Sequence, residues 1–461
     1  MRTARLAWEL FRAEGLRGFV ERLADRMETR RGRRGERTVA PAELLPAGGT
    51  VPVLDVLATP LAPRWGGVPA QLGVRLVEEA LLRPTALLAP DAGWWTVRTT
   101  HGDDRRRARL GPWRPGTDPS QGPDGTVGTV LEAARLVGAK IVNVEGTSGW
   151  PSKALPGLAG QGLKLVVSLH DFALYCPRPN LVEEPHTRFC GYSRDAERCR
   201  ACLGATWALP AGFVEGWRKA GEELFASADA LVYPSEFLRR QHAELFPVTR
   251  PGLERVIEPA APGGKALAGA DPSRGRRRPA GSEEAFRIAF VGAYRPHKGA
   301  LVFEELLRRE AVRAGRPVRW SILGSGDPAS LLAARPLGAH VTGHYRAGAL
   351  TRLLREEGID LALLLSIWPE AFAMTLSECR GAGVPVVAFA HGAIADRVAA
   401  EGGGLLVPPE EGADGIAAML EKVLAGQRAI PPFRGTESGA SASRAAAART
   451  DLYRTLLEEE T

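Results

Sequence analysis

Short apolar runs alternate with segments of helical periodicity from Thr50 onward. The run "VPVLDVLA" (51–58) predicts a buried strand, and residues 59–83 indicate a glycine-bearing loop that leads into a helix. Alternation of this kind favours a parallel sheet with helices on both faces. The same pattern predicts further strands at 85–90, 140–146, 163–171 and 230–235, and helices at 129–138, 223–229 and 236–246.

A segment rich in Gly, Pro and Arg at 263–285 interrupts the alternation, which is typical of a linker. Beyond it the alternation resumes. We therefore expect two doubly wound, Rossmann-like α/β domains facing each other across a cleft, because such sheets bind ligands at the carboxyl ends of their strands. The expected second-domain strands are 286–293, 318–326, 340–345, 359–366, 384–390 and 403–410, and the expected helices are 300–315, 327–335, 347–358, one from about 371, 394–402 and 413–424.

The predicted domain organisation follows from these changes in hydrophobic pattern and composition along the chain. It comprises an N-terminal segment at 1–45, a first domain at 50–262 with a Cys-rich loop at 172–206, the linker at 263–285, a second domain at 286–440 and a C-terminal helix at 441–461. The C-terminal helix is expected to pack back toward the first domain.

The N-terminal segment is basic and amphipathic. Its first 38 residues hold 11 Arg and 6 acidic residues. Two interpretations remain open: the apolar stripe docks on the body of the protein, or the basic helix lies on an anionic membrane surface. The stripe consists of Leu16, Phe19, Val20, Leu23 and Met27, at helical spacing.

Composition and charge narrow the class of protein. The chain has 461 residues, 44% of them hydrophobic, which is enough for two or three domain cores. The net charge of +7 and the pI of about 9.4 raise the question of a polyanionic partner. However, both signs of charge are interspersed, and no basic-aromatic pattern of a nucleic-acid module appears. No apolar run reaches the ~20 residues of a membrane span and no signal peptide is indicated, so we expect a cytoplasmic protein with reduced cysteines.

Two glutamates, Glu370 and Glu378, flank the start of a predicted helix that begins near Ala371. The free N–H groups at a helix start suit a phosphate. At about 1.5 Å per residue the two carboxylates would lie ~12 Å apart along the axis, the span of a nucleotide-sugar. Carboxylates are pure acceptors and so suit sugar and ribose hydroxyls. The alternative is that Glu370 merely favours the helix dipole and Glu378 is a solvated surface residue.

Several motifs together resemble a known family. The segment "SIWPEAFAMTLSECRGAGVPVVAFAHGAIADRV" (366–398) resembles the E-x7-E region of retaining GT-B glycosyltransferases of family 4. "FVGAYRPHKGALVFEELL", "VVSLHDFALYCPRPNL", "ALVYPSEFLRR" and "PRWGGVPAQL" resemble further segments of that family. The resemblance extends from about Val51 to Lys422 and implies the GT-B fold.

The resemblance also implies roles for individual residues. Glu370 corresponds to the glutamate that contacts donor sugar hydroxyls, Glu378 to the one that binds the donor ribose, and Lys298 to the lysine that neutralises the diphosphate. His170 corresponds to the histidine of the first domain that approaches the donor sugar and phosphate. Donor contacts are further expected from the glycine loops and the helix amides, namely from Gly66, Gly67, Gly292, Phe372, Ala373 and Met374.

Two positions depart from the family pattern. Ala293 stands where many members have an arginine, and Arg295, two residues further on, is a candidate to replace that phosphate contact. Ala373 stands where glycine is usual. Neither departure removes the lysine or the glutamates.

Four cysteines follow the His170 strand, spaced C-x13-C-x8-C-x2-C. In a reducing compartment such a cluster suits a closed, structural zinc site. An iron–sulfur cluster, a disulfide and free thiols remain alternatives. The cysteines are Cys176, Cys190, Cys199 and Cys202.

The implied function is transfer of a sugar, with retention, from a nucleoside-diphosphate sugar to a glycan or lipid-linked acceptor, as in cell-surface polysaccharide synthesis. No metal-binding Asp-x-Asp motif appears, so no catalytic cofactor is expected. Peripheral contact with the inner membrane face is a further expectation, and a nucleic-acid partner is not. The alternatives are a non-catalytic sugar-nucleotide-binding or scaffold protein, and an epimerase or phosphorylase of the same fold.

Overall fold

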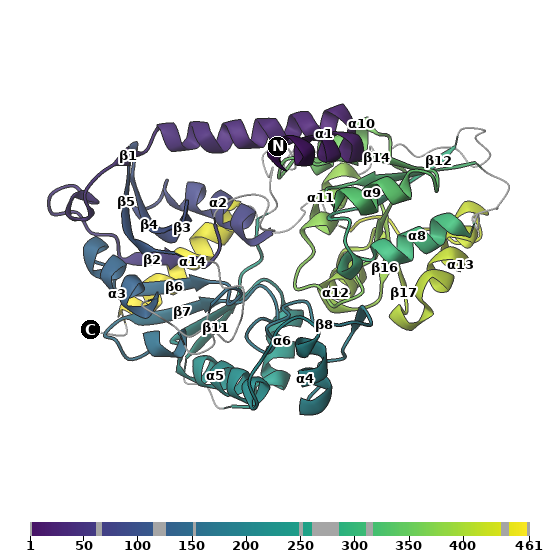
Figure 1. Cartoon of the computed structure of the whole chain (residues 1–461). Coiled ribbons are helices and arrows are strands. Elements are labelled where there is room, and N and C mark those ends of the chain that lie inside the picture. The colour runs from purple at the N-terminus through teal and green to yellow at the C-terminus, as the bar shows by residue number, and fades with distance from the viewer. Residues whose placement is uncertain are drawn as a thin grey trace. The chain divides into compact units, whose positions relative to one another are not determined.

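The computed structural model describes residues 2–60, 67–113, 126–150, 154–248, 252–260, 285–309, 317–434 and 442–458. The chain divides into two compact units. The C-terminal unit comprises Met1–Glu28 and Ala261–Gly439, and the N-terminal unit comprises Thr29–Ala260 and Ala440–Thr461. Most of the predicted linker at 263–285 lies outside the described residues. Figure 1 shows the elements of both units.

The C-terminal unit is built on a six-stranded sheet in its described part, and every pairing in it is parallel. The strand order is β14-β13-β12-β15-β16-β17, so the chain winds outward from β12 in one direction and then from β15 in the other. This is the doubly wound order, and its switch point lies between β12 and β15. The strands are β12 (Phe286–Val291), β13 (Val318–Leu323), β14 (Ala339–Gly343), β15 (Leu361–Leu364), β16 (Val386–Phe389) and β17 (Gly404–Val407).

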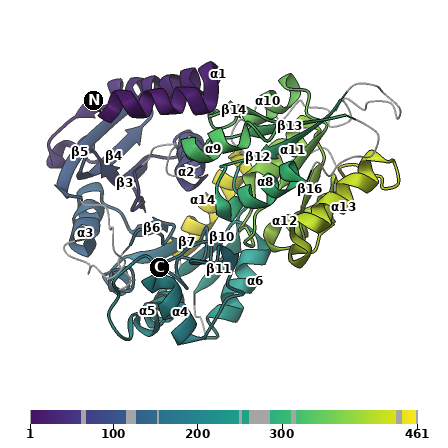
Figure 2. The ribbon, with the colours of Figure 1, turned by 45° about the vertical axis from the view of Figure 1, so that its right-hand side comes forward.

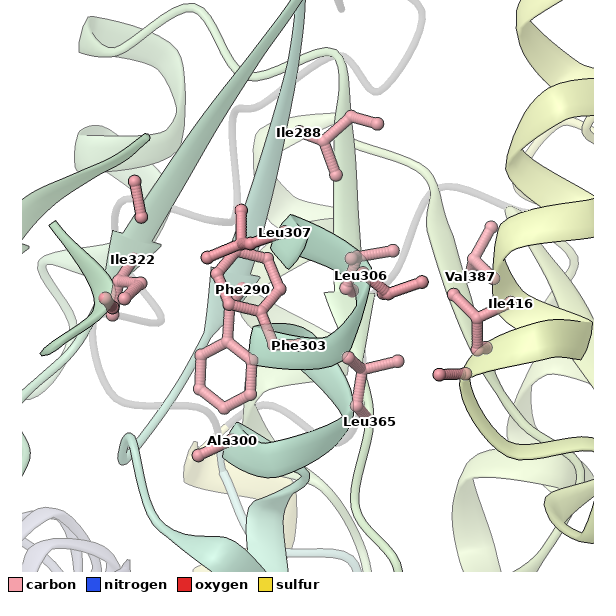
Figure 3. Packing of buried hydrophobic residues seen from close by; sticks show 14 of the residues in the cluster. Ile288, Phe290, Ala300, Phe303, Leu306, Leu307, Ile322, Leu365, Val387 and Ile416 are labelled. Carbon is pink, nitrogen blue, oxygen red and sulfur yellow. The ribbon is translucent and has the colours of Figure 1, made fainter. Parts of the chain in front are cut away.

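Helices cover both faces of this sheet, and alternate strand residues enter two separate cores because strand side chains alternate in direction. On one face Ile288 and Phe290 of β12 pack with Phe303 of α8 and Ile416 of α13, as Figure 3 shows. On the other face β12 contributes Ala289. The helices are α8 (Ala300–Arg308), α9 (Pro328–Ala334) and α13 (Gly412–Leu424) on the first face, and α10 (Leu350–Glu356), α11 (Met374–Ala382) and α12 (Gly392–Glu401) on the second.

The N-terminal unit contains a nine-stranded sheet in the order β1-β5-β4-β3-β2-β6-β7-β10-β11. Six neighbouring strands of this order, running from β3 through β2, β6, β7 and β10 to β11, pair in parallel, as predicted. They are β2 (Val53–Val56), β3 (Thr85–Asp91), β6 (Ile141–Glu145), β7 (Lys164–Ser168), β10 (Ala230–Tyr233) and β11 (Leu253–Val256). The helices of this unit are α2 (Gly67–Glu79), α3 (Thr126–Val137), α4 (Ala196–Gly204), α5 (Phe213–Ser227), α6 (Glu236–Leu245) and α14 (Ala442–Glu458).

The prediction of a wholly parallel sheet is wrong at one edge. β4 (Trp94–His101) and β5 (Asp104–Pro112) form an antiparallel hairpin on β3, and β1 (Arg37–Thr38) pairs with β5. The hairpin turns through Gly102, whose φ is 58°. The four arginines of β5 stand at exposed and half-buried positions alike, so its hydrophobic pattern has no clear period of two.

The last helix returns to the N-terminal unit. α14 packs its apolar side, including Leu452 and Leu456, against Val53 of β2, Ile141 of β6 and Val166 of β7. Figures 1 and 2 both show α14 in yellow against these strands. The helix also carries Arg449 toward the interior of the unit.

The first helix, α1 (Arg2–Arg34), is kinked at Gly15, and its part up to Glu28 belongs to the C-terminal unit and docks there. Ala13 is fully buried in the core of that unit, and Gly18 lies so close to residues 343–344 that a Cβ would be 3.0 Å from the His344 nitrogen. Arg17 pairs with Glu356 and Glu357 of the α10 end.

The predicted apolar stripe is not the docking face. Leu16, Val20, Leu23 and Met27 are 68%, 51%, 43% and 56% exposed, and Phe19 is half-buried. Docking uses the small residues Ala13 and Gly18 instead, because they let the helix approach closely. Within the described part of the chain, no helix is long and apolar enough to cross a membrane.

Candidate functional site

Two loops meet at the switch point of the C-terminal sheet. One follows β12 and contains a short 3-10 helix, Pro296–Lys298, and the other follows β15. Gly299 has a φ of 88° between these loops, and a Cβ there would lie 2.0 Å from the Leu365 carbonyl oxygen. Glycine is therefore required for the two loops to approach. Gly292, at the end of β12, has a φ of 114°.

Lys298 and Glu370 form an ion pair between these loops. The Lys298 Nζ lies 2.8 Å from Glu370 Oε2, and the Ser366 hydroxyl hydrogen-bonds to the other oxygen of Glu370. The Lys298 Nζ also lies 5.6 Å from the centre of the Trp368 ring. Burial raises the pKa of Glu370, but Lys298 and the hydrogen bonds outweigh burial and leave the pKa below its ordinary value. The structure thus brings together two residues that are 72 positions apart in sequence.

Two histidines surround this pair without adding charge at neutral pH. Burial, together with the positive charge of the neighbouring Lys298, lowers the pKa of His297 to about 4. Burial also lowers the pKa of His391, whose Nε2 lies 2.7 Å from the Ser366 carbonyl oxygen. Lys298, which is 27% exposed, therefore supplies the positive charge of the pair.

The loop that carries Glu370 is held from the α12 side. The Ala393 N–H donates to the Glu370 carbonyl oxygen over 2.9 Å. A Cβ on Gly392, whose φ is 63°, would lie 2.7 Å from the Glu370 nitrogen. The segment "HGA" at 391–393 therefore positions the glutamate by direct backbone contact.

The E-x7-E helix begins later than predicted. α11 starts at Met374 rather than near Ala371, because Ala373 adopts a left-handed conformation with a φ of 61°. Glu370 therefore lies in the loop, and the spacing of ~12 Å along one helix axis does not apply. Phe372 and Ala373 precede the helix, and their N–H groups and that of Met374 belong to the turn that leads into it, where a helix offers free donors.

Arg397 of α12 stabilises this turn, a role that the sequence analysis missed. Its Nη1 donates to the carbonyl oxygens of Phe372 and Ala373 over 3.0 and 3.2 Å, and its Nη2 donates to the Ser377 hydroxyl over 2.9 Å. Its guanidinium also stacks 4.2 Å from the centre of the Phe372 ring. Arg397 thereby fixes the carbonyl groups of the two residues that precede α11.

Glu378 is buried in the second turn of α11 and is only 5% exposed, so the alternative of a solvated surface residue is wrong. Among the described residues, no hydrogen-bond donor or cation pairs with its carboxyl group. Burial alone raises the pKa of Glu378 to about 8. A buried carboxyl group without a partner is costly and is a common mark of a binding site.

The remaining predicted donor contacts differ in their placement. Arg295 is exposed and precedes the Lys298 turn, and its charge contributes to lowering the pKa of His297. Gly67 is the first residue of α2 in the N-terminal unit. Gly66 lies outside the described residues.

In the N-terminal unit His170 lies two residues after β7, at the carboxyl edge of the sheet. Its Nε2 is 3.0 Å from Oε2 of Glu145, the last residue of β6. The other Glu145 oxygen lies 2.9 Å from Arg75 Nη2 and 3.3 Å from Arg449 Nη1. Burial opposes ionisation of Glu145, but Arg75, Arg449 and His170 outweigh it and hold the pKa well below its ordinary value.

Further buried residues extend this network of charges and hydrogen bonds around Glu145. Arg75 also pairs with Asp55 at 2.7 Å and with Glu79 at 2.6 Å, and the Asn143 amide donates to both Asp55 and Glu145. These groups are buried, and each has at least one ionic or hydrogen-bonding partner, although the Asp55 Oδ2 atom itself has none. Sequence reasoning did not identify this network, because its members come from β2, α2, β6 and α14.

A pocket of about 490 Å³, its open mouth included, adjoins the network within the N-terminal unit. Glu145, His170, Tyr233, Glu258 and Arg449 contribute to its walls. The pocket therefore lies where the carboxyl ends of β6, β7 and β10 meet, and His170 is presented to it by Glu145.

The four cysteines surround the small β8–β9 hairpin (Val182–Glu183 and Arg188–Phe189) and α4. All four are free and half-buried. Burial, with smaller contributions from the other three thiols, raises the pKa of Cys176 to about 12, so the four lie near one another. However, within the described ranges no three or more His, Cys, Asp or Glu side chains are arranged to hold a metal ion. The thiols as placed do not fit a zinc site, and the zinc hypothesis stays a prediction. The other members of the cluster are Cys190, Cys199 and Cys202.

Comparison with protein families gives a match within the C-terminal unit. Residues 285–426 match the family described as "Glycosyl transferases group 1". The match covers about a third of the chain and lies within the C-terminal unit. It contains Lys298, Glu370, Glu378 and Arg397, and so the whole constellation described above for the C-terminal unit. No relative was found among curated proteins.

Solved structures extend the comparison to both units. The sucrose-phosphate synthase of Thermosynechococcus elongatus is similar with a TM-score of 0.55 and 15% identity, over 89% of this chain and 100% of that one. A glycosyltransferase from Rickettsia africae gives 0.53 and 14%, over 89% and 99%. The Anabaena protein HepE in complex with UDP-glucose gives 0.51 and 16%, over 88% and 98%. These similarities confirm the predicted GT-B fold of two Rossmann-like domains.

Proposed function

We propose that the protein is a retaining glycosyltransferase of family 4 that uses a nucleoside-diphosphate sugar. The observation that carries the proposal is the placement of Lys298, Glu370 and the unpaired Glu378 around the start of α11 at the sheet switch point. Ligands of doubly wound sheets bind at this point. The group 1 match covers the same residues.

The proposed roles follow from charge and geometry. Departure of the nucleotide develops negative charge on the diphosphate, and a fixed cation stabilises that state more than the ground state. Lys298 supplies the cation, and the amides of Phe372, Ala373 and Met374 supply neutral donors. Glu370 accepts from sugar hydroxyls, and Glu378 accepts from the ribose diol.

Binding of the diphosphate requires a local rearrangement of charge. Lys298 is paired with Glu370 at 2.8 Å, so a phosphate competes with Glu370 for the ammonium group. Lys298 can satisfy both because an ammonium group has three donors. His170, held by Glu145, remains the proposed sugar- and phosphate-facing group of the N-terminal unit, as the family resemblance implies.

The proposed donor is a UDP-sugar, and the proposed transferred group is a hexose. Support comes from HepE, a protein of the same fold whose structure contains UDP-glucose. The proposed acceptor is a glycan or a lipid-linked oligosaccharide of cell-surface polysaccharide synthesis, handled in the cytoplasm. No catalytic metal is required, since Lys298 and the helix amides meet the electrostatic need.

A second candidate function is donor binding without transfer. Two observations favour it: Ala293 replaces the arginine usual in the family, and Arg295, its candidate substitute, is exposed. An epimerase of the same fold would convert one nucleotide-sugar into another and would release no net nucleotide.

Incubation with a panel of nucleoside-diphosphate sugars, followed by mass spectrometry of sugar and nucleotide, tests the proposal. We expect one donor to release its nucleotide and a glycosylated product to accumulate when acceptor is present. Glu378→Ala should weaken donor binding, whereas the matched variant Glu410→Ala, of an exposed glutamate, should not. Binding without turnover would favour the second candidate. The proposal fails if no donor binds, or if Glu378→Ala leaves donor affinity unchanged. Metal analysis of the purified chain tests the zinc prediction separately.

A further inference from the structure

The docked helix α1 leaves an apolar face uncovered. Among the described residues, eleven large hydrophobic side chains are exposed, and five of them lie on α1. No other element carries so many. These five are Trp8, Leu16, Val20, Leu23 and Met27.

Four of them form one narrow stripe. With 3.6 residues per turn, Leu16, Val20, Leu23 and Met27 lie within about 60° of one another around the helix. Gly18, which is packed against residues 343–344 of the C-terminal unit, lies about 160° away. The docking contacts therefore orient the stripe outward rather than cover it.

The stripe runs directly into a strongly basic segment. Residues 26–37 contain six arginines and two glutamates. Arg22 and Arg17, which border the stripe, are held by Glu14 and by Glu356 and Glu357. The excess of positive charge is therefore concentrated at the C-terminal end of the helix.

We propose that α1 is a membrane-docking element that binds an anionic lipid surface through this stripe. Apolar side chains on one face of a surface-lying helix enter the headgroup boundary, and adjacent arginines bind anionic headgroups. A second copy of the chain is disfavoured, because four side chains fall far short of the ~800 Å² per partner of a stable interface, and two basic segments repel. This inference is independent of the proposed reaction, since it requires no donor or acceptor.

Vesicle sedimentation with the full-length protein, without sugar nucleotide, tests the proposal. We expect binding to vesicles of phosphatidylcholine mixed with phosphatidylglycerol, little binding to phosphatidylcholine alone, and weaker binding as salt is raised. The triple variant Leu16→Gln, Val20→Gln, Leu23→Gln should lose about tenfold or more in vesicle affinity. It should melt at the wild-type temperature, because the three side chains are exposed.

The matched control is Leu301→Gln, of an equally exposed leucine on α8 in the same unit. It should bind vesicles as the wild type does. The proposal is overturned if the wild type ignores anionic vesicles or if the triple variant binds them normally. It is also overturned if size-exclusion chromatography shows a wild-type dimer that the triple variant dissolves, since the stripe would then face a second copy.

Discussion

The two units each bury a charged cluster at the carboxyl edge of a parallel sheet, but the clusters differ in how completely their charges are paired. In the N-terminal unit, Glu145 contacts Arg75, Arg449 and His170 at once. In the C-terminal unit, Glu370 pairs with Lys298, which is 27% exposed to solvent. Glu378 has no partner among the described residues.

The difference indicates different uses of buried charge. A network whose members satisfy one another fixes the positions of its side chains, and it strongly penalises removal of one member. A site that keeps an unpaired carboxyl group and a partly exposed cation has capacity left for a ligand. We therefore interpret the first cluster as a positioning device for His170, and the second fits the donor site proposed above.

The largest expected effect compares equivalent substitutions in the two clusters. Glu145→Gln leaves Arg449 buried without its carboxylate and removes one of the three carboxylates around Arg75, so it should lower the free energy of unfolding by about 3–5 kcal/mol. Glu370→Gln should cost only about 1 kcal/mol, because Lys298 can be hydrated. Urea denaturation measures both. Equal losses would contradict the distinction between the clusters.

Removal of the cation should affect catalysis more than folding. Lys298→Ala should reduce the transfer rate about a hundredfold to a thousandfold, because the leaving diphosphate loses its fixed positive charge. Donor-release kinetics and thermal melting provide the two measurements. Lys422→Ala, of an exposed lysine in the same unit, serves as the control and should leave both unchanged. A rate within a few-fold of wild type would remove Lys298 from the proposed mechanism.

The unpaired carboxyl group predicts a pH dependence of stability. The pKa of Glu378 is about 8 in the folded chain and near its ordinary value of 4.5 when unfolded. Between these two pH values the unfolded state has lost the proton and the folded state keeps it, so stability falls as pH rises. The loss should amount to roughly a few kcal/mol.

Glu378→Gln should flatten this slope, and chemical denaturation at a series of pH values checks it. Glu410→Gln, of an exposed glutamate, should keep the wild-type slope. An unchanged slope in Glu378→Gln would mean that the carboxyl group ionises as readily in the folded chain as in the unfolded one.

A smaller effect is expected from the arginine that holds the turn before α11. Arg397→Lys keeps the charge but loses the fork that reaches Phe372, Ala373 and Ser377, and it should cost about 2 kcal/mol of stability. The KM for the donor should rise with it, because the amides of the turn lose their orientation. Arg308→Lys, at an exposed ion pair, should change neither quantity appreciably.

The smallest effect concerns the backbone of the same turn. Ala373 has a φ of 61°, a conformation that glycine adopts with less strain. Ala373→Gly should therefore raise the free energy of unfolding by about 1 kcal/mol while leaving the transfer rate close to that of the wild type. Thermal melting and donor turnover test this prediction, and a destabilised variant would show that the alanine methyl group contributes packing instead.

Much of the fold could be predicted from the chain alone. Buried parallel strands require continuous apolar runs, and those of the C-terminal unit stand out in the sequence between Gly and Pro signals. The predicted strands contain β12 through β17 apart from the first residue of β14. The hairpin β4–β5 escaped prediction because edge strands are half exposed, and the arginines of β5 obscure any alternation.

The site could be predicted in part. Lys298, Glu370 and Glu378 were found through resemblance to a family, since their spacing alone allowed a trivial interpretation. The start of α11 was misplaced because Arg397, 24 residues beyond Ala373, holds the preceding turn open. No local pattern indicates such a contact.

By itself the sequence determined where most of the buried strands and the helices that cover them lie, because apolar periodicity reflects burial of each element against a core. It also determined which residue types are available for phosphate and hydroxyl recognition. Only the tertiary structure decided that Glu145 holds His170, that Glu378 is buried without a partner, and that the stripe of α1 faces outward. Each of these depends on which distant groups share a space, and periodicity along the chain carries no information about that.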